Sequence, residues 1–249
     1  MRLTYKSLLA AAGLLMLAGS TKAATIDWSG YKWEVNSNDR IGQGLVRGSL
    51  SNVLIDANGY LHLRMDQQDG KWCGAETWTT EPLGYGTFYW VFDGPLTTME
   101  PQIVLAGFTY GPQIHQGTDC QNEIDVEFSK WNNPDNKNNG DFDDYGPPPA
   151  VRGDDAENDW NFTGGNVATI RVEWSADKIV QSVWNGVVPI DAPTSTAAVT
   201  WTNTKTKSIP LVACPFMFNL WTFKTLPTKS MEAVVRDFKY VAAPKAETK

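Results

Sequence analysis

The chain has 249 residues, of which 42% are hydrophobic, 20% charged and 12% aromatic, and its formal net charge is −7. Length and composition are those of a globular protein with one large or two small domains. The negative charge argues against nucleic acid and anionic lipid as partners, because both are themselves anionic. Eleven tryptophans without a basic patch favour a carbohydrate ligand over a phosphate-bearing one. We expect a monomer that contacts neither nucleic acid nor a membrane.

Residues 1–23 have the features of a bacterial export signal. Arg2 and Lys6 form a charged start, an apolar run extends from Leu8 to Ala18, and Thr21–Ala23 ends in a small residue suited to cleavage. The apolar run is too short to span a bilayer. The sequence therefore predicts a cleaved signal peptide and a secreted or periplasmic mature protein.

The remaining chain alternates between apolar and polar residues with a period of two, which is typical of strands. No stretch of twelve residues shows convincing helical spacing. Many short strands without helices indicate a sandwich or a barrel, so we expect one β-sandwich domain over residues 24–243 and a short polar tail over 244–249. The predicted strands are 60–65, 86–92, 102–110, 123–128, 167–174, 179–184, 215–221 and 231–241.

Residues 132–166 differ from the rest because they are rich in Asn, Asp, Gly and Pro. They predict one long loop, and long loops in compact domains are often functional.

The three cysteines are Cys73, Cys120 and Cys214. An exported chain can keep disulfides, but an odd number leaves at least one thiol free or paired elsewhere. A Cys73–Cys120 bond is one of the pairings that the sequence leaves open.

The most informative stretch is 122–128, Asn-Glu-Ile-Asp-Val-Glu-Phe. Alternate side chains of a strand share a face, so Glu123, Asp125 and Glu127 point one way while the intervening apolar residues point into a core. Three carboxylates in a row repel one another and gain the strand nothing. Breaking a local rule in this way is typical of a functional site. The alternatives are a solvated acidic edge strand or a metal site, for which a linear row of oxygens is poorly arranged.

Retaining glycoside hydrolysis is the chemistry that uses such a row. One carboxylate attacks the anomeric carbon, and another carries a proton for the leaving oxygen. Crowded acids cannot all ionise, so the pKa of one rises, as an acid catalyst near neutral pH requires. The shorter Asp125 can hydrogen-bond a neighbouring glutamate and hold a proton within the row.

The motif Glu-Ile-Asp-Val-Glu-Phe resembles the Glu-x-Asp-x-Glu signature of glycoside hydrolase family 16, which includes lichenases, laminarinases, agarases and carrageenases. Further elements resemble that family in the same chain order, namely Gly84–Gly86, Phe108–Pro112, Val172–Gly186 and Phe218–Trp221. The resemblance implies a concanavalin A-like β-jelly-roll sandwich of two antiparallel sheets with a concave substrate cleft. It also implies an endo-acting, retaining hydrolase of a β-linked polysaccharide.

The resemblance assigns roles to individual residues. Glu123 would be the nucleophile, Glu127 the general acid/base and Asp125 the assisting acid, while Glu76 would bind sugar hydroxyls. No cofactor is required for this chemistry. One departure is that lichenases have Trp-Asp before the first glutamate where this chain has Gln-Asn at 121–122, which removes a sugar-stacking tryptophan.

Aromatic and polar side chains would line the cleft. Met217, Asn219 and Trp221 alternate with core residues, so they would share a face, and Trp131 would share the acidic face if its strand continued. A buried core position is the alternative for each tryptophan, and we assign Trp90 and Trp174 to the core. The substrate-binding candidates are Glu76, Trp78, Tyr85, Tyr110, Trp131, Asn219 and Trp221.

Some family members bind calcium on the convex face, and Gly59 and Asp237 match positions used there in lichenases. The resemblance thus suggests a structural calcium site; a turn glycine and a solvated aspartate are the alternative interpretation.

Three functions remain open at this level. The first is an endo-glycosidase acting on β-1,3-glucan, mixed-linkage glucan or a galactan. The second is a lectin-like sandwich that binds carbohydrate without turnover. The third is a transglycosylase, in which a sugar replaces water in the second step.

Overall fold

The structure is a computed structural model that describes residues 24–111, 122–147 and 159–244. The predicted signal peptide and nearly all of the polar tail lie outside these ranges, so both stay predictions. No helix in the described part of the chain combines the length and the hydropathy that a membrane span requires.

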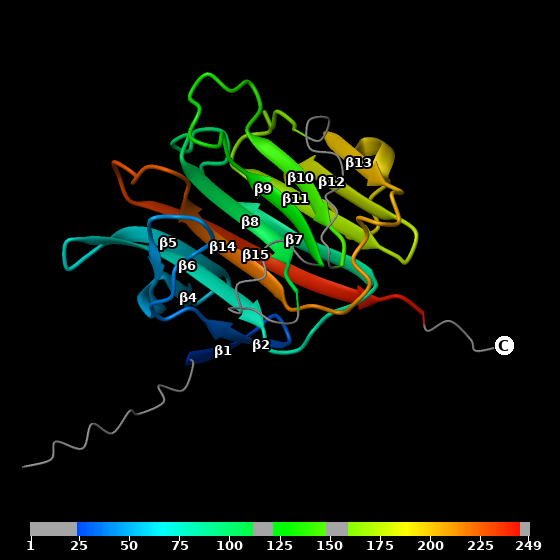
Figure 1. Cartoon of the computed structure of the whole chain (residues 1–249), viewed down its shortest axis with the longest axis horizontal. Helices are drawn as coiled ribbons and strands as arrows, with labels where there is room; N and C mark the ends of the chain where they lie inside the picture. Colours follow the sequence, from blue (N-terminus) through cyan, green and yellow to red (C-terminus); the bar gives the residue numbers. More distant parts are fainter. Residues whose placement is uncertain (1–23, 112–121, 148–158, 245–249) are drawn as a thin grey trace, which may run out of the picture.

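The strands form two layers packed face to face, as the sequence predicted (Figure 1). We call the layer that carries the acidic strand the inner layer and the other the outer layer. The inner layer contains β1 (Ala24–Trp28), β2 (Tyr31–Val35), β6 (Lys71–Thr79), β14 (Phe216–Thr222), β8 (Ile103–Thr109), β9 (Glu123–Phe128) and β10 (Gly140–Tyr145). The outer layer contains β4 (Val53–Ile55), β5 (Leu61–Gln68), β15 (Met231–Ala242), β7 (Gly86–Asp93), β11 (Val167–Trp174), β12 (Ile179–Asn185) and β13 (Val199–Asn203).

Among the described residues, the backbone ladders of the two layers join through one strand pair. The ends of β5 and β6 pair as an antiparallel hairpin, with Gln67 opposite Trp72. The short strand β3 (Arg47–Gly48) lies parallel to β6, whereas the other strand pairs that the structure describes are antiparallel. Helical structure in the described ranges is confined to two 3-10 turns, η1 (Leu50–Asn52) and η2 (Thr194–Thr196). The all-β prediction is therefore confirmed.

Each segment that the sequence predicted as a strand forms one, with ends that differ by a few residues. The prediction of one long loop over 132–166 was wrong, because β10 (Gly140–Tyr145) lies within it. Its sequence, Gly-Asp-Phe-Asp-Asp-Tyr, is rich in residues that strands disfavour. Pairing along all six residues with β9 overrides that local preference.

The core between the layers is mainly aromatic and aliphatic. Phe216, Phe218 and Leu220 of β14 are almost fully buried in it, and so are Trp90 and Trp174, as predicted. Burying each such side chain contributes about 1.5–3 kcal/mol relative to leaving it exposed. Because strand side chains alternate, this burial turns the other residues of β14 toward the opposite face of the inner layer.

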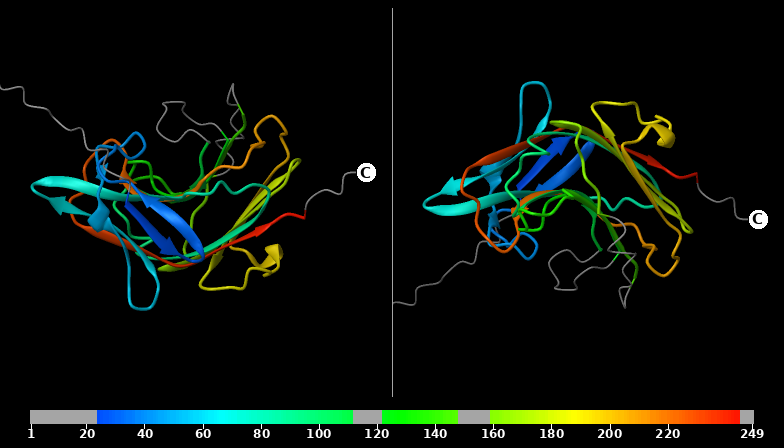
Figure 2. Two further views of the ribbon diagram at one scale, coloured as in Figure 1. Left: turned by 90° about the horizontal axis from the view of Figure 1, so that it is seen from below. Right: turned by 90° about the horizontal axis from the view of Figure 1, so that it is seen from above.

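Both layers are bent in the same sense, and the inner layer lies on the inside of the bend (Figure 2). The face of the inner layer that points away from the core is therefore concave. We call it the concave face. It presents alternate residues of β6, β14, β8, β9 and β10, and it is the surface on which the predicted site residues can meet.

Candidate active site

The acidic row, Glu123, Asp125 and Glu127, lies on the concave face of β9. Ile124 and Val126 between these residues are buried in the core, which fixes the direction of the three carboxylates. Asp125 is only 6% exposed, and the two glutamates are half-buried. The alternation predicted from the sequence is thus the alternation of the structure.

The strand next to the acidic row adds further acids to it. Asp143 of β10 lies opposite Asp125, and Asp141 lies opposite Glu127. Tyr145 lies opposite Glu123, and its hydroxyl donates to Oδ2 of Asp143 at 2.9 Å. The sequence analysis missed all three β10 residues because it treated this segment as a loop. The alternation of Asp141, Asp143 and Tyr145 with Phe142 was the available signal.

Glu76 reaches the same face from β6. It lies opposite Asn219 of β14, which lies opposite Ala106 of β8, and Ala106 lies opposite Glu127. Glu76, Asn219 and Glu127 therefore share one line across the concave face. The prediction that Glu76 and Asn219 belong near the acidic row agrees with this placement.

The carboxyl group of Glu76 is almost fully buried, and burial raises its pKa to about 7, against the weaker opposing effect of hydrogen bonds from Asn36 and Asn219. Asn36 Nδ2 donates to Oε2 of Glu76 at 2.7 Å. Asn36 follows directly on β2, and its own Oδ1 accepts from the backbone N–H of Asp39 at 2.8 Å, which orients the amide. The sequence analysis missed Asn36, since a single asparagine carries no periodic signal.

Trp131, Trp221 and Phe223 form an aromatic corner at the Glu127 end of the concave face. The ring centroid of Trp131 lies 5.3 Å from that of Phe223 and 6.5 Å from that of Trp221, both edge to face. Trp221 is only 6% exposed because the loop at Gly42 and Gly44 lies against its ring. Trp131 and Phe223 are half-buried and flank it.

Trp131 does not reach this position by a continuing strand. Strand β9 ends at Phe128, and Trp131 and Asn132 both have left-handed backbone conformations with φ of 51° and 61°. Such conformations are costly in residues other than glycine. The turn is held by a bond from Thr225 Oγ1 to Asn132 Oδ1 at 2.8 Å. The sequence predicted the right face for Trp131, but the turn, not the strand, places it there.

Trp78 and Tyr110 lie with an apolar patch beside Asp125. Trp78 is 8% exposed and clusters with Phe108 and Met217, and Phe108 lies opposite Asp125 on the neighbouring strand. Tyr110 packs edge-on against Phe108, with ring centroids 6.5 Å apart.

Tyr85 lies at the margin of the main core rather than in this patch. Its ring packs edge-on against Trp174 with centroids 5.0 Å apart, and its backbone carbonyl accepts from the hydroxyl of Tyr240.

Cys214 lies near the other end of the row. Its thiol is buried, and burial, assisted by the negative charge of Glu123, raises its pKa to about 12. The thiol therefore stays protonated at neutral pH, and its Sγ donates to the carbonyl of Val212 at 3.3 Å. Cys73 is also a free thiol, and Cys120 lies outside the described residues.

The two residues suggested for calcium binding have other partners. The carbonyl of Gly59 accepts from Trp28 Nε1 at 2.8 Å, and Asp237 Oδ2 lies 2.5 Å from Nζ of Lys239. Calcium takes six to eight oxygen ligands, and among the described residues no group of three acidic, histidine or cysteine side chains is arranged to hold a metal ion. These donors are a poor fit to calcium, and a site there stays a prediction from the resemblance.

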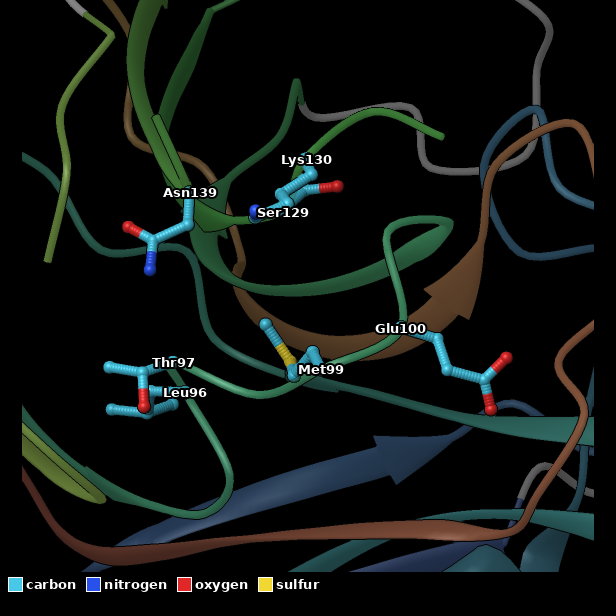
Figure 3. A pocket seen from close by; sticks show the side chains of 7 residues that line it. All are labelled: Leu96, Thr97, Met99, Glu100, Ser129, Lys130 and Asn139. Atoms are coloured by element: carbon cyan, nitrogen blue, oxygen red, sulfur yellow. The ribbon is translucent and has the colours of Figure 1, made fainter. Parts of the chain in front are cut away.

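Two cavities lie away from the acidic row. Figure 3 shows the smaller one beyond the end of β9, where Ser129, Lys130 and Asn139 face the loop of Leu96 to Glu100. Its volume of about 10 Å³ is room for about one water molecule, which is too little for a sugar. The larger, of about 230 Å³, lies between residues 95–103 and 229–232.

Solved structures resemble this chain in fold at low sequence identity. Neither a family model nor a curated protein sequence matches it. A solved Bacillus licheniformis β-glucanase superimposes with a TM-score of 0.60 at 18% identity, covering 85% of this chain and 92% of that one.

Two further solved structures give the same result. A prokaryotic β-1,3-1,4-glucanase (lichenase) from a mouse hindgut metagenome has a TM-score of 0.57 at 20% identity, covering 84% of this chain and 92% of the lichenase. A glycoside hydrolase family 16 endo-glucanase from Bacteroides ovatus has a TM-score of 0.58 at 15% identity, covering 87% and 96%. At identities this low, the superposition establishes a shared fold and carries no statement about activity. The chain thus has the β-sandwich fold of glycoside hydrolase family 16 glucanases and lichenases, as its sequence motifs suggested.

Proposed function

We propose that this protein is an endo-acting glycoside hydrolase that cleaves internal β-linkages of a polysaccharide with retention of configuration. The observation that carries the proposal is the placement of Glu123, Asp125 and Glu127 on one concave sheet face. The fold shared with family 16 glucanases supports it. A pure binding site has no use for a row of acids that must share protons.

The reaction would proceed in two displacements. In the first, the carboxylate of Glu123 attacks the anomeric carbon while the bond to the leaving sugar oxygen breaks, and Glu127 donates its proton to that oxygen. In the second, Glu127 takes a proton from water, and the resulting oxygen attacks the anomeric carbon and releases Glu123. Two inversions give net retention. Asp125 lies between the two glutamates and would hydrogen-bond the nucleophile.

The rest of the concave face would bind the polymer. Glu76 and Asn219 offer polar atoms for sugar hydroxyls on the line that leads to Glu127. The aromatic corner of Trp131, Trp221 and Phe223 would pack against the apolar C–H faces of sugar rings. Trp78 and Tyr110 extend this apolar lining beside Asp125. Tyr85 stays a weaker candidate because its ring packs on Trp174.

Mixed-linkage β-glucan is the first substrate to test. One solved neighbour is a Bacteroides ovatus mixed-linkage glucan enzyme in complex with G4G4G3G product. β-1,3-Glucan and marine galactans fit the same chemistry, whereas the acidic chain disfavours heavily sulfated polymers. The predicted signal peptide would deliver the enzyme to the periplasm or the medium, where such polymers occur. No step uses a cofactor or metal.

The deciding experiment compares the wild-type protein with Glu123→Gln on a panel of polysaccharides, measuring soluble reducing ends. We expect hydrolysis by the wild type, none by Glu123→Gln, and binding of the same polymer by both. Glu173→Gln, in the outer layer with a 44% exposed side chain, is the matched control and should stay active. Proton NMR of early products would show the retained anomer.

Other results would change the assignment. Polymer binding without reducing ends from the wild type would make the protein a carbohydrate-binding module. Products longer than the substrate in the presence of an added oligosaccharide acceptor would make it a transglycosylase. Full activity of Glu123→Gln would remove the proposed nucleophile.

A further inference from the structure

A buried glutamine of the outer layer lies where an apolar side chain would be expected. Gln181 of β12 is 0% exposed and points into the core between Ile179 and Val183, both fully buried. It lies opposite Val172 on one neighbouring strand. An amide in apolar surroundings is unfavourable unless its polar atoms are hydrogen-bonded, so the contacts of Gln181 need a physical reason.

The side chain of Gln181 crosses the core to the catalytic strand. Its Nε2 donates to the backbone carbonyl of Asp125 at 2.5 Å. Its Oε1 is buried without a hydrogen-bond partner among the described residues. A residue kept only for stability would satisfy both atoms or be apolar. The amide is thus better matched to holding one carbonyl than to stabilising the core.

The carbonyl that Gln181 holds belongs to the middle residue of the acidic row. Strand β9 has a single strand, β10, on its outer side in the described structure, so it lies near the edge of the inner layer. A hydrogen bond from the core side fixes the distance between the β9 backbone at Asp125 and the outer layer. The carboxylates of Glu123 and Glu127 are two residues to either side and move with it.

A second polar contact joins the same two edges. Asn203 of β13 donates from Nδ2 to Oδ2 of Asp144 of β10 at 2.9 Å, inside the core. Strand β13 pairs with β12, and Asn203 lies opposite Ile179 of β12. The outer-layer edge therefore donates hydrogen bonds to both β9 and β10 from the core side, whereas the centre of the sandwich is held by aromatic packing.

We propose that Gln181 is a positioning residue for catalysis, which sets the placement of the acidic row through the backbone carbonyl of Asp125. This inference rests on the proposed function for its effect on turnover. Its structural part, that Gln181 controls the geometry and hence the titration of the row, can be tested without any substrate.

The main variant is Gln181→Met, which keeps the size of the side chain and removes the donor. We expect kcat to fall about ten-fold or more with little change in KM, because small displacements of catalytic groups cost rate rather than binding. The matched control is Val183→Ala, on the same face of β12 and equally buried; it should lower the thermal midpoint and leave kcat within about two-fold of wild type.

The conservative variant Gln181→Glu tests the donor itself. A buried carboxylic acid stays protonated at mildly acidic pH, so its O–H can donate to the Asp125 carbonyl. We expect Gln181→Glu to recover most of the lost kcat at about pH 5. Its kcat should fall again at higher pH, where the introduced carboxyl group ionises. A variant as slow as Gln181→Met at that pH would contradict the proposal.

The readout that needs no substrate is a carbon-13 NMR titration of the aspartate and glutamate side-chain carboxyls. We expect at least one carboxyl of the acidic row to titrate differently in Gln181→Met and unchanged in Val183→Ala. If Gln181→Met lowers the thermal midpoint but keeps wild-type titrations and kcat, Gln181 is a structural residue and the inference is overturned. If the titration changes while no polysaccharide is cleaved by the wild type, the positioning role stands and the proposed hydrolase function fails.

Discussion

Two strand pairs of this sandwich differ in the charge of the residues that face their acidic side chains across the pair. In the outer layer, Glu232 of β15 lies opposite Arg64 of β5, and its Oε1 accepts from Arg64 Nε at 2.9 Å. In the inner layer, Asp125 and Glu127 of β9 lie opposite the acids of β10. Opposite charges across strands stabilise a sheet, and like charges destabilise it. The first pair therefore serves the fold, and the second is explained by the proposed chemistry.

The titration of individual carboxyls follows the same division. Burial alone would raise the pKa of Glu232, but hydrogen bonds from His62 and Arg64 outweigh it and lower the pKa. Burial raises the pKa of Glu76 on the concave face to about 7. The outer-layer acid is thus held as a carboxylate, while the inner-layer acid is half protonated near neutral pH. Groups whose pKa is raised by burial are typical of sites that bind or transfer protons.

Removing Glu127, the proposed general acid, should have the largest effect on activity of the changes that test this contrast. Glu127→Gln should lower kcat on a polysaccharide about 10²–10⁴-fold, because the leaving oxygen then receives no proton. Glu232→Gln, which removes a carboxylate from the outer layer, should leave kcat unchanged. A release assay with an aryl β-glycoside adds a second measurement: the loss of kcat/KM in Glu127→Gln should be much smaller there, since a phenolate leaves in the first displacement without help, while kcat stays low because the second displacement lacks its base. Equal losses of kcat/KM on both substrates would remove Glu127 from its role as the acid.

The acidic row could be predicted from the sequence because alternation along one strand is a local property. The partners of the row could not, because they depend on which strands pair and in what register. Asp141 and Asp143 come to the row through β10, a strand whose composition favours a loop. Asn36 and Gln181 each reach the site through one side-chain hydrogen bond, which leaves no periodic pattern in the sequence. Local patterns thus predicted the acidic row that we propose to be catalytic, and tertiary pairing supplied the residues around it.

Glu76 offers the second test, in which the comparison is made through stability instead of rate. Its pKa is about 7 in the fold and 4.5 when exposed, so folding favours the neutral form. This destabilises the protein progressively as pH rises from about 4.5 to about 7, by on the order of 3 kcal/mol in full, and the penalty is absent below that window. Glu76→Gln should therefore gain stability relative to wild type as pH rises, measured by urea unfolding at several pH values. A stability difference that does not vary with pH would contradict the raised pKa.

The outer-layer pair of Glu232 and Arg64 should give the smallest effect on stability, and its change with pH should have the opposite sign to that of Glu76. Because the pKa of Glu232 is lowered from 4.5, its contribution is present above about pH 4.5 and is lost as pH falls through the folded pKa. Glu232→Gln should thus lose stability relative to wild type at neutral pH and lose nothing in acid. A double-mutant cycle with Arg64→Ala should give a coupling energy below about 1 kcal/mol, since both side chains are 41% exposed and water screens the pair. A coupling of several kcal/mol would mean that the outer-layer charges support the fold as strongly as buried ones, and the distinction between the two strand pairs would then rest on their geometry alone.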